Sequence, residues 1–115
     1  MLVAISIPIF TNQLKKARLA TNQANARSGY AACIGAWLDN NAASTGKGFS
    51  YDYYVKTGLN QSPGGEGTGT CTVRIEDWKI DTVIGPNGFK AGDKIATRFS
   101  LYFDKDGKLT SVTAQ

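Results

Sequence analysis

The sequence predicts an α+β fold in which one long N-terminal helix packs on a small antiparallel sheet. Residues 11–27 contain no proline or glycine and are rich in alanine, leucine, lysine, arginine and glutamine, which favour a helix. The last third of the chain instead alternates apolar and polar residues between short turns, as antiparallel strands do. A chain of 115 residues is long enough for one domain with a modest core.

The first ten residues are uncharged and almost all apolar. A membrane-spanning helix needs about 20 such residues, so this segment is about half a span. It also lacks the basic start of a secretory signal peptide. Two interpretations stay open at this point: a short buried core element, or the end of a membrane helix.

The helix is predicted over residues 11–43 and carries two apolar faces. Spacings of three and four residues define a narrow seam of mostly small side chains, which lets another helix approach closely. The seam comprises Phe10, Leu14, Ala17, Thr21, Ala24, Ser28, Ala31, Gly35 and Leu38. A second, bulkier face lies toward the end of the helix and suits packing on a sheet. This face comprises Ala26, Tyr30, Cys33, Ile34 and Trp37.

The two faces divide the chain into two parts. Residues 1–28 are expected to protrude as a half-helix, and residues 29–115 are expected to form a globular head. The protruding part has too little protein left to cover it, so it must find packing partners outside the monomer. The excess positive charge lies here too, because residues 1–38 contain no acid. The basic residues of that stretch are Lys15, Lys16, Arg18 and Arg27.

A long connection is predicted between the helix and the sheet, over residues 44–70. A loop of this length is unusual unless it is functional or held in place. Its glycine-rich part, residues 64–69, lacks the lysine and hydroxyl residue of a phosphate loop and is interpreted as flexible. The aromatic cluster expected to pack the connection onto the head comprises Phe49, Tyr51, Tyr53 and Tyr54.

The sheet is predicted to occupy residues 71–115. Clean alternation of apolar residues places its strands at residues 71–76, 94–103 and 109–114. The segment 104–108 is interpreted as a tight turn in which Gly107 takes a positive φ. A calcium loop is disfavoured there, because no acid follows the glycine.

The composition argues against most enzyme classes. The chain has no histidine, the commonest general base and a common metal ligand. A cysteine nucleophile would lack its usual base, and acids near turns, such as Glu76, are interpreted as surface groups. No cofactor, metal site or enzymatic activity is expected. Nucleic acid is not expected as the main partner, because the aromatics lie in the charge-balanced head. A local patch of Lys90, Lys94 and Arg98 stays open.

The two cysteines need a joint interpretation. Cys33 is predicted on the sheet-facing side of the helix and Cys71 at the start of the first strand. A disulfide between them would close the long connection, and the loop-entropy model gives it about 4 kcal/mol. It would also imply an oxidising compartment outside the cytosol. Two buried free thiols are the alternative.

Three motifs stand in the opening third of the chain. They are Ile-Ser-Ile-Pro-Ile-Phe at residues 5–10, Gln-Leu-Lys-Lys at 13–16, and Thr-Asn-Gln-Ala-Asn-Ala-Arg at 21–27. Together they resemble the later part of the N-terminal helix of a type IV pilin, and most of all that of pilins from Gram-positive anaerobes. The glycine before the pilin cleavage site and the Phe-Thr-Leu-Ile-Glu type of start are not in the sequence. The resemblance therefore implies that Met1 corresponds to a position inside the helix of an N-terminally truncated chain.

The resemblance implies a pilin-like fold and a structural subunit that polymerises into a helical filament on the cell surface, for adhesion, twitching motility or attachment. Before assembly such a subunit is anchored in the cytoplasmic membrane through the more N-terminal part of the helix, which the resemblance places before Met1. The helix is expected to kink or unwind near Pro8, which lacks an N–H and clashes with the carbonyl of Ala4. A pseudopilin of a type II-like secretion system, or a DNA-binding minor pilin for uptake, are the alternatives.

The resemblance also implies the contacts between subunits. Lys15, Lys16 and Arg18 would pair with acids of adjacent subunits. The apolar contacts with neighbouring helices would come from Leu2, Val3, Ile5, Ile7, Pro8, Ile9, Phe10, Leu14, Ala17, Thr21 and Ala24.

Overall fold

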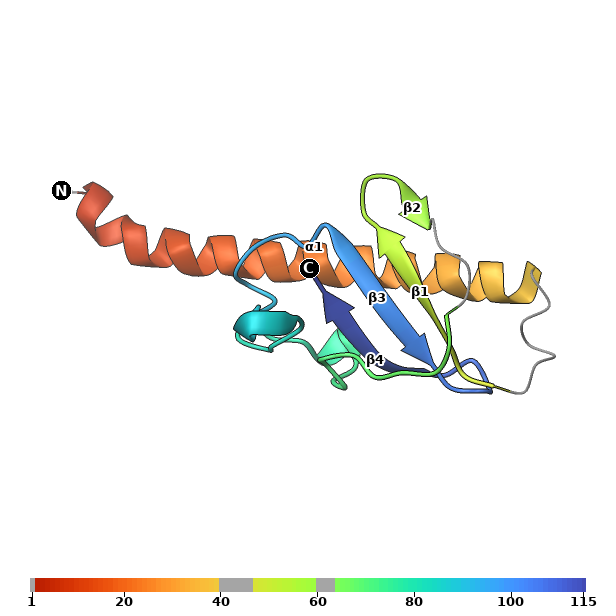
Figure 1. The fold of residues 1–115 in the computed structure, drawn as a ribbon. Coiled ribbons are helices and arrows are strands. Elements are labelled where there is room, and N and C mark those ends of the chain that lie inside the picture. Colours follow the sequence, from red (N-terminus) through yellow and green to blue (C-terminus); the bar gives the residue numbers. More distant parts are fainter. Residues whose placement is uncertain (1, 40–46, 60–63) are drawn as a thin grey trace.

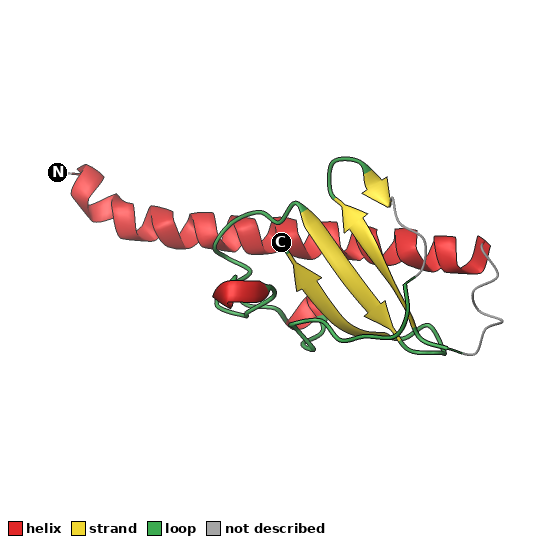
Figure 2. Ribbon diagram, viewed as in Figure 1, coloured by secondary structure: helices red, strands yellow, loops and turns green. Residues whose placement is uncertain are grey.

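The protein consists of one long helix and a small antiparallel sheet, which confirms the predicted α+β class (Figure 1). The computed structural model describes residues 2–39, 47–59 and 64–115, and its account of side chains leaves out residues 2–9 and 59. Helix α1 (Leu2–Asp39) crosses one face of the sheet and continues far beyond it (Figure 2). The molecule is elongated, with principal extents of 63 × 23 × 21 Å.

The sheet has the strand order β2-β1-β3-β4, and all its pairs are antiparallel. Strand β4 (Leu109–Ala114) lies where the sequence predicts it, and β3 (Arg98–Phe103) is a shortened version of the predicted second strand. The turn between them has the predicted form, with Gly107 at φ 82°. Strand β2 (Gly58–Leu59) is only a short addition to β1.

The aromatic segment predicted as part of a long loop is a central strand instead, β1 (Phe49–Tyr54). Phe49 pairs with Phe103 and Tyr51 with Leu101, so β1 lies directly beside β3. Its alternation of buried aromatic and less buried polar residues fits a sheet with one covered face. The predicted connection over residues 44–70 was therefore wrong as a single loop.

The predicted strand over residues 71–76 is also wrong. Only Cys71 joins the sheet, through two 2.8 Å backbone hydrogen bonds with Val112 of β4. The chain then turns into the short 3₁₀ helix η2 (Ile75–Asp77), and a second such turn, η3 (Pro86–Gly88), follows later. The indole of Trp78 donates to the carbonyl of Val73 at 3.0 Å, which holds this turn closed. A strand here would require the turn to open.

The glycine-rich segment, interpreted from sequence as flexible, is tied to the sheet where the structure describes it. The amide of Gly64 donates to the carbonyl of Ser50 at 2.7 Å. The amide of Gly69 donates to the hydroxyl of Ser111 at 2.6 Å. These contacts lay the segment along the sheet.

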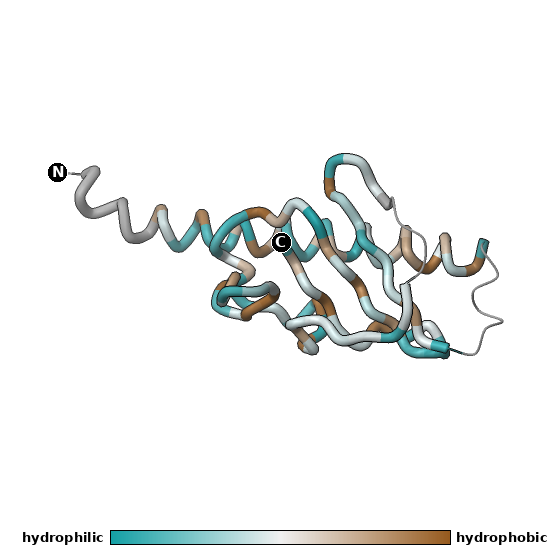
Figure 3. Tube along the Cα trace, in the orientation of Figure 1, coloured by the Kyte–Doolittle hydropathy of each residue, from teal (hydrophilic) through white to brown (hydrophobic). Residues whose placement is uncertain are grey.

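The core lies between α1 and the covered face of the sheet. The predicted bulky face of the helix does point into it: Ala26 and Cys33 are fully buried, although Tyr30 stays 38% exposed. Stacked rings join the two layers, with centroids 4.8 Å apart for Trp37 and Phe49. Figure 3 shows hydrophobic and hydrophilic positions interspersed along α1 from Phe10 onward, as expected for a helix with only one covered side.

The boundary between protruding helix and head differs from the prediction. Leu19 already packs against the core, and Arg18 and Asn22 already hydrogen-bond to the head. The head therefore begins about ten residues before the expected boundary after residue 28. The helical backbone also runs unbroken through Pro8, so the expected unwinding is not found in the described backbone of this isolated chain.

Candidate functional site

The part of α1 that precedes the head is the first candidate site. Residues 2–17 span about 24 Å at the rise of an α-helix. Within this part Phe10 is 68% exposed and Leu14 is 39% exposed. Phe10 is the most exposed large apolar side chain of the described residues, and it lies one helical turn from Leu14, so the two form an apolar surface that another molecule can cover.

The predicted seam stays uncovered over the described length of the helix. Ala17 and Ala24 are exposed, Thr21 is half-buried, and at the far end Leu38 is 59% exposed. Its predicted extension toward the N-terminus lies outside the described side chains. That extension comprises Leu2, Val3, Ile5, Ile7, Pro8 and Ile9.

Three polar side chains fix α1 to the head, and the sequence analysis missed two of them. The fully buried Asn22 donates to the carbonyls of Ala91 and Lys94 at 2.8 and 2.9 Å. Its side-chain oxygen accepts the amide of Ala96 at 2.9 Å. The amide of Gln23 donates to the carbonyl of Ile75 at 2.8 Å. Asparagine is a poor helix former, so its position in the middle of a helix could have indicated that Asn22 has a specific hydrogen-bonding role.

The third anchoring side chain is Arg18, whose guanidinium donates to the carbonyl of Asp93 at 3.0 Å. Arg18 was expected to pair with an acid of an adjacent subunit, and here its partner belongs to its own head. Lys15 and Lys16 make no ion pair within the described part of the chain. The two lysines thus remain the free cations of the predicted set.

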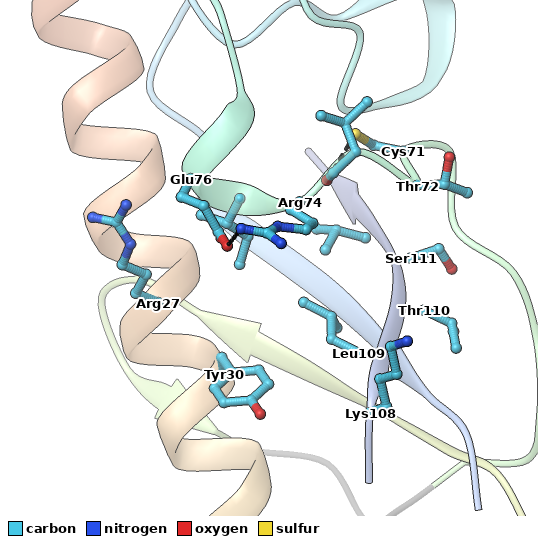
Figure 4. Close-up of a pocket in the computed structure, with 13 residues that line it drawn as sticks. Arg27, Tyr30, Cys71, Thr72, Arg74, Glu76, Lys108, Leu109, Thr110 and Ser111 are labelled. Carbon is cyan, nitrogen blue, oxygen red and sulfur yellow. Dashed lines mark hydrogen bonds and ion pairs between the residues drawn. The ribbon is translucent and has the colours of Figure 1, made fainter. Parts of the chain in front are cut away.

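A groove of about 400 Å³ lies between α1 and β4 and is the second candidate site (Figure 4). Arg27 and Tyr30 of the helix form one side, and the chain around Arg74 closes one end. Arg74 is bound to Glu76 at 2.7 Å. The pKa of Glu76 is lowered, first by a backbone hydrogen bond and further by Arg74, so this carboxylate is not poised as a general acid. The groove therefore offers a surface for binding, and its carboxylate is not suited to acid catalysis.

The predicted disulfide is not formed, because Cys33 and Cys71 are both buried free thiols. Cys33 lies on the core face of the helix, whereas Cys71 borders the outer edge of β4 and directs its thiol toward the carbonyl of Val73 at 3.7 Å. Burial, with a smaller effect of Asp52, raises the pKa of Cys33 to about 12. Such a thiol is protonated and unreactive at neutral pH.

Comparison with protein-family models, curated proteins and solved structures found no match. Within the described residues, no group of His, Cys, Asp or Glu side chains is arranged to hold a metal ion. In that same part of the chain, no helix has the length and apolar character needed to cross a membrane.

Proposed function

We propose that this chain is a structural subunit of a type IV pilus and that it polymerises through the part of α1 that precedes the head. The observation that carries the proposal is the exposure of Phe10 and Leu14 on a helix that extends beyond its own domain. The pilin-like motifs at residues 5–16 support it, since they lie in this same part of the helix.

Burial energetics favour assembly through this surface. Covering a fully exposed large apolar side chain contributes about 1.5–3 kcal/mol. Phe10 is 68% exposed and Leu14 39% exposed, so each would contribute a corresponding fraction of that value. In a filament, each subunit would bury Phe10 and Leu14 against neighbouring helices, and the small residues Ala17 and Ala24 would allow close approach. Lys15 and Lys16 would pair with acids of adjacent subunits. Before assembly, the subunit would be anchored in the cytoplasmic membrane, as the resemblance implies.

The test is a charge placed in the proposed interface. Leu14→Asp would require a buried carboxylate among apolar side chains, so cells with this variant should lack filaments in electron micrographs while the head stays folded. The matched control is Val83→Asp, because Val83 is 40% exposed on the head and lies outside the seam. Normal filaments from Leu14→Asp would contradict the proposal.

Two other experiments separate the related alternatives. A pseudopilin predicts loss of protein export on deletion of the gene, without surface filaments in the wild type. A minor pilin for DNA uptake predicts salt-dependent DNA binding by the protein, most directly through Lys90, Lys94 and Arg98. In the structure Lys94 already lies over the ring of Phe89, 4.9 Å from its centroid, and Arg98 contacts the hydroxyl of Tyr54 at 3.5 Å.

A further inference from the structure

Basic side chains from two distant parts of the sequence gather where α1 meets the head. The hydrogen bond from Arg18 to the carbonyl of Asp93 joins the helix to the loop over residues 90–94. Lys15 precedes Arg18 by three residues and lies on the same side of the helix, whereas Lys16 precedes it by two and points to the opposite side. Both lie within about 5 Å of Arg18 along the helix axis, so the cations surround the helix at one level. We call this group the basic collar; it comprises Lys15, Lys16, Arg18, Lys90 and Lys94.

The collar is accessible and its charge is only partly offset. Lys16, Lys90 and Lys94 are exposed. Asp93 lies in the same loop, and its carboxylate accepts the backbone amide of Lys90 at 3.0 Å. Asp81 lies on the turn that pairs with this loop. Counted against Asp93 and Asp81, the five cations leave the collar with a net positive charge.

An apolar element accompanies the cations. Ile95 directly follows Lys94 and is 50% exposed. On the other side of the collar, residues 1–14 carry no charge at all. The order along the molecule is therefore an uncharged helix, a ring of cations with an exposed isoleucine, and then the balanced head. This order matches the depth profile of a bilayer with anionic headgroups.

We infer that the basic collar docks the unassembled subunit on an anionic phospholipid surface. The inference rests on the proposed function in one respect, since it takes the N-terminal segment to lie in the bilayer. Headgroup phosphates would contact the collar cations, and Ile95 would enter the interface. On assembly Lys15 and Lys16 would exchange headgroups for acids of neighbouring subunits. The collar would thus hold the head against the membrane until the subunit enters the filament.

The size of the effect follows from the charge count. Each lysine or arginine near an anionic surface strengthens partitioning about fivefold, within a Debye length of about 10 Å. Removing two collar lysines should therefore weaken binding to anionic vesicles about 25-fold. Binding to neutral vesicles should be nearly unchanged, because it depends on apolar contacts alone.

The experiment is flotation of the full chain with vesicles of phosphatidylcholine alone or of an equal mixture with phosphatidylglycerol. The test variants are Lys90→Gln/Lys94→Gln and Lys15→Gln/Lys16→Gln. The matched control is Lys105→Gln/Lys108→Gln, at the turn that contacts Trp37. That turn lies about 28 Å from Arg18 along the helix. Circular dichroism confirms that each variant is folded.

The expected result is tighter binding of the wild type and the control to the anionic vesicles, weakened at about 0.5 M salt. Both collar variants should lose most of this preference. Equal binding of the wild type to both vesicle types would overturn the inference, as would a control that loses as much as the collar variants. If only filament formation responds to Lys15→Gln/Lys16→Gln, the lysines serve subunit contacts alone. Filaments in electron micrographs test the proposed function separately.

Discussion

Replacing Asn22 by alanine should be one of the most damaging changes in the head. The side chain is fully buried and makes three hydrogen bonds, to the carbonyls of Ala91 and Lys94 and from the amide of Ala96. Truncation leaves these three backbone groups without partners. Each buried unsatisfied group costs about 1–3 kcal/mol, and water entering the vacated space keeps the cost near the lower value. The expected loss is about 3 kcal/mol of unfolding free energy.

Urea unfolding, followed by the fluorescence of Trp37 and Trp78, measures this loss directly. The midpoint should fall while the slope stays unchanged, because the surface exposed on unfolding is nearly the same. Thermal melts should show a decrease of about 12 °C for a domain of this size. The control is Asn25→Ala, the same substitution less than one turn further along α1, at a half-buried position without a hydrogen bond described for its side chain. A loss below about 1 kcal/mol for Asn22→Ala, equal to the control, would refute the reasoning.

Two further predictions concern close packing and the buried thiols. Gly85→Ala should lower the melting temperature by several degrees, because a Cβ there would clash with the carbonyl oxygen of Ala114. Gly35→Ala is the control: its Cβ meets nothing within 4 Å, so this variant should be neutral or slightly stabilising. Neither Cys33 nor Cys71 should react with a thiol reagent until the protein unfolds. Since the pKa of Cys33 is raised from 9.0 to about 12, unfolding free energy should fall as pH rises through that range, and less so in Cys33→Ala. A flat pH profile in both proteins would contradict this.

The parts of the fold that were predicted correctly have signals that are local in sequence. Helix α1 follows from its composition and its spacing of three and four residues. Strand β4 and the turn at Gly107 follow from alternation next to a glycine that adopts a positive φ. In each case the residues that decide the conformation lie within a few positions of one another.

The parts that were predicted wrongly depend on distant partners. Strand β1 pairs with β3, about 50 residues away, and its aromatic residues alone did not distinguish a strand from a packed loop. Cys71 belongs to a segment in which apolar and polar residues alternate as in a strand. The segment pairs with β4 only at Cys71, so no continuous strand pairing forms. The disulfide was predicted with Cys71 at the start of a strand that does not form, and in the structure both cysteines are free thiols.

In the candidate site, too, the features set by local sequence were predicted and those set by distant partners were not. Exposure of Phe10 and Leu14 was predicted, because an apolar helix longer than its domain leaves residues uncovered. The anchor formed by Asn22 was not, because its partners lie in the loop over residues 91–96. That anchor also moved the start of the head to about Arg18 and gave this arginine an intramolecular partner.

The reactivity of a cysteine at position 14, compared between the monomer and the assembled filament, shows whether this part of α1 packs between subunits. The natural thiols Cys33 and Cys71 are buried and should stay silent toward a maleimide reagent, so Leu14→Cys reports on this position alone. If the subunits pack through this part of α1, the cysteine should be labelled rapidly in the solubilised monomer and strongly protected in the filament. Equal labelling rates in the two states would show that this part of α1 does not pack between subunits.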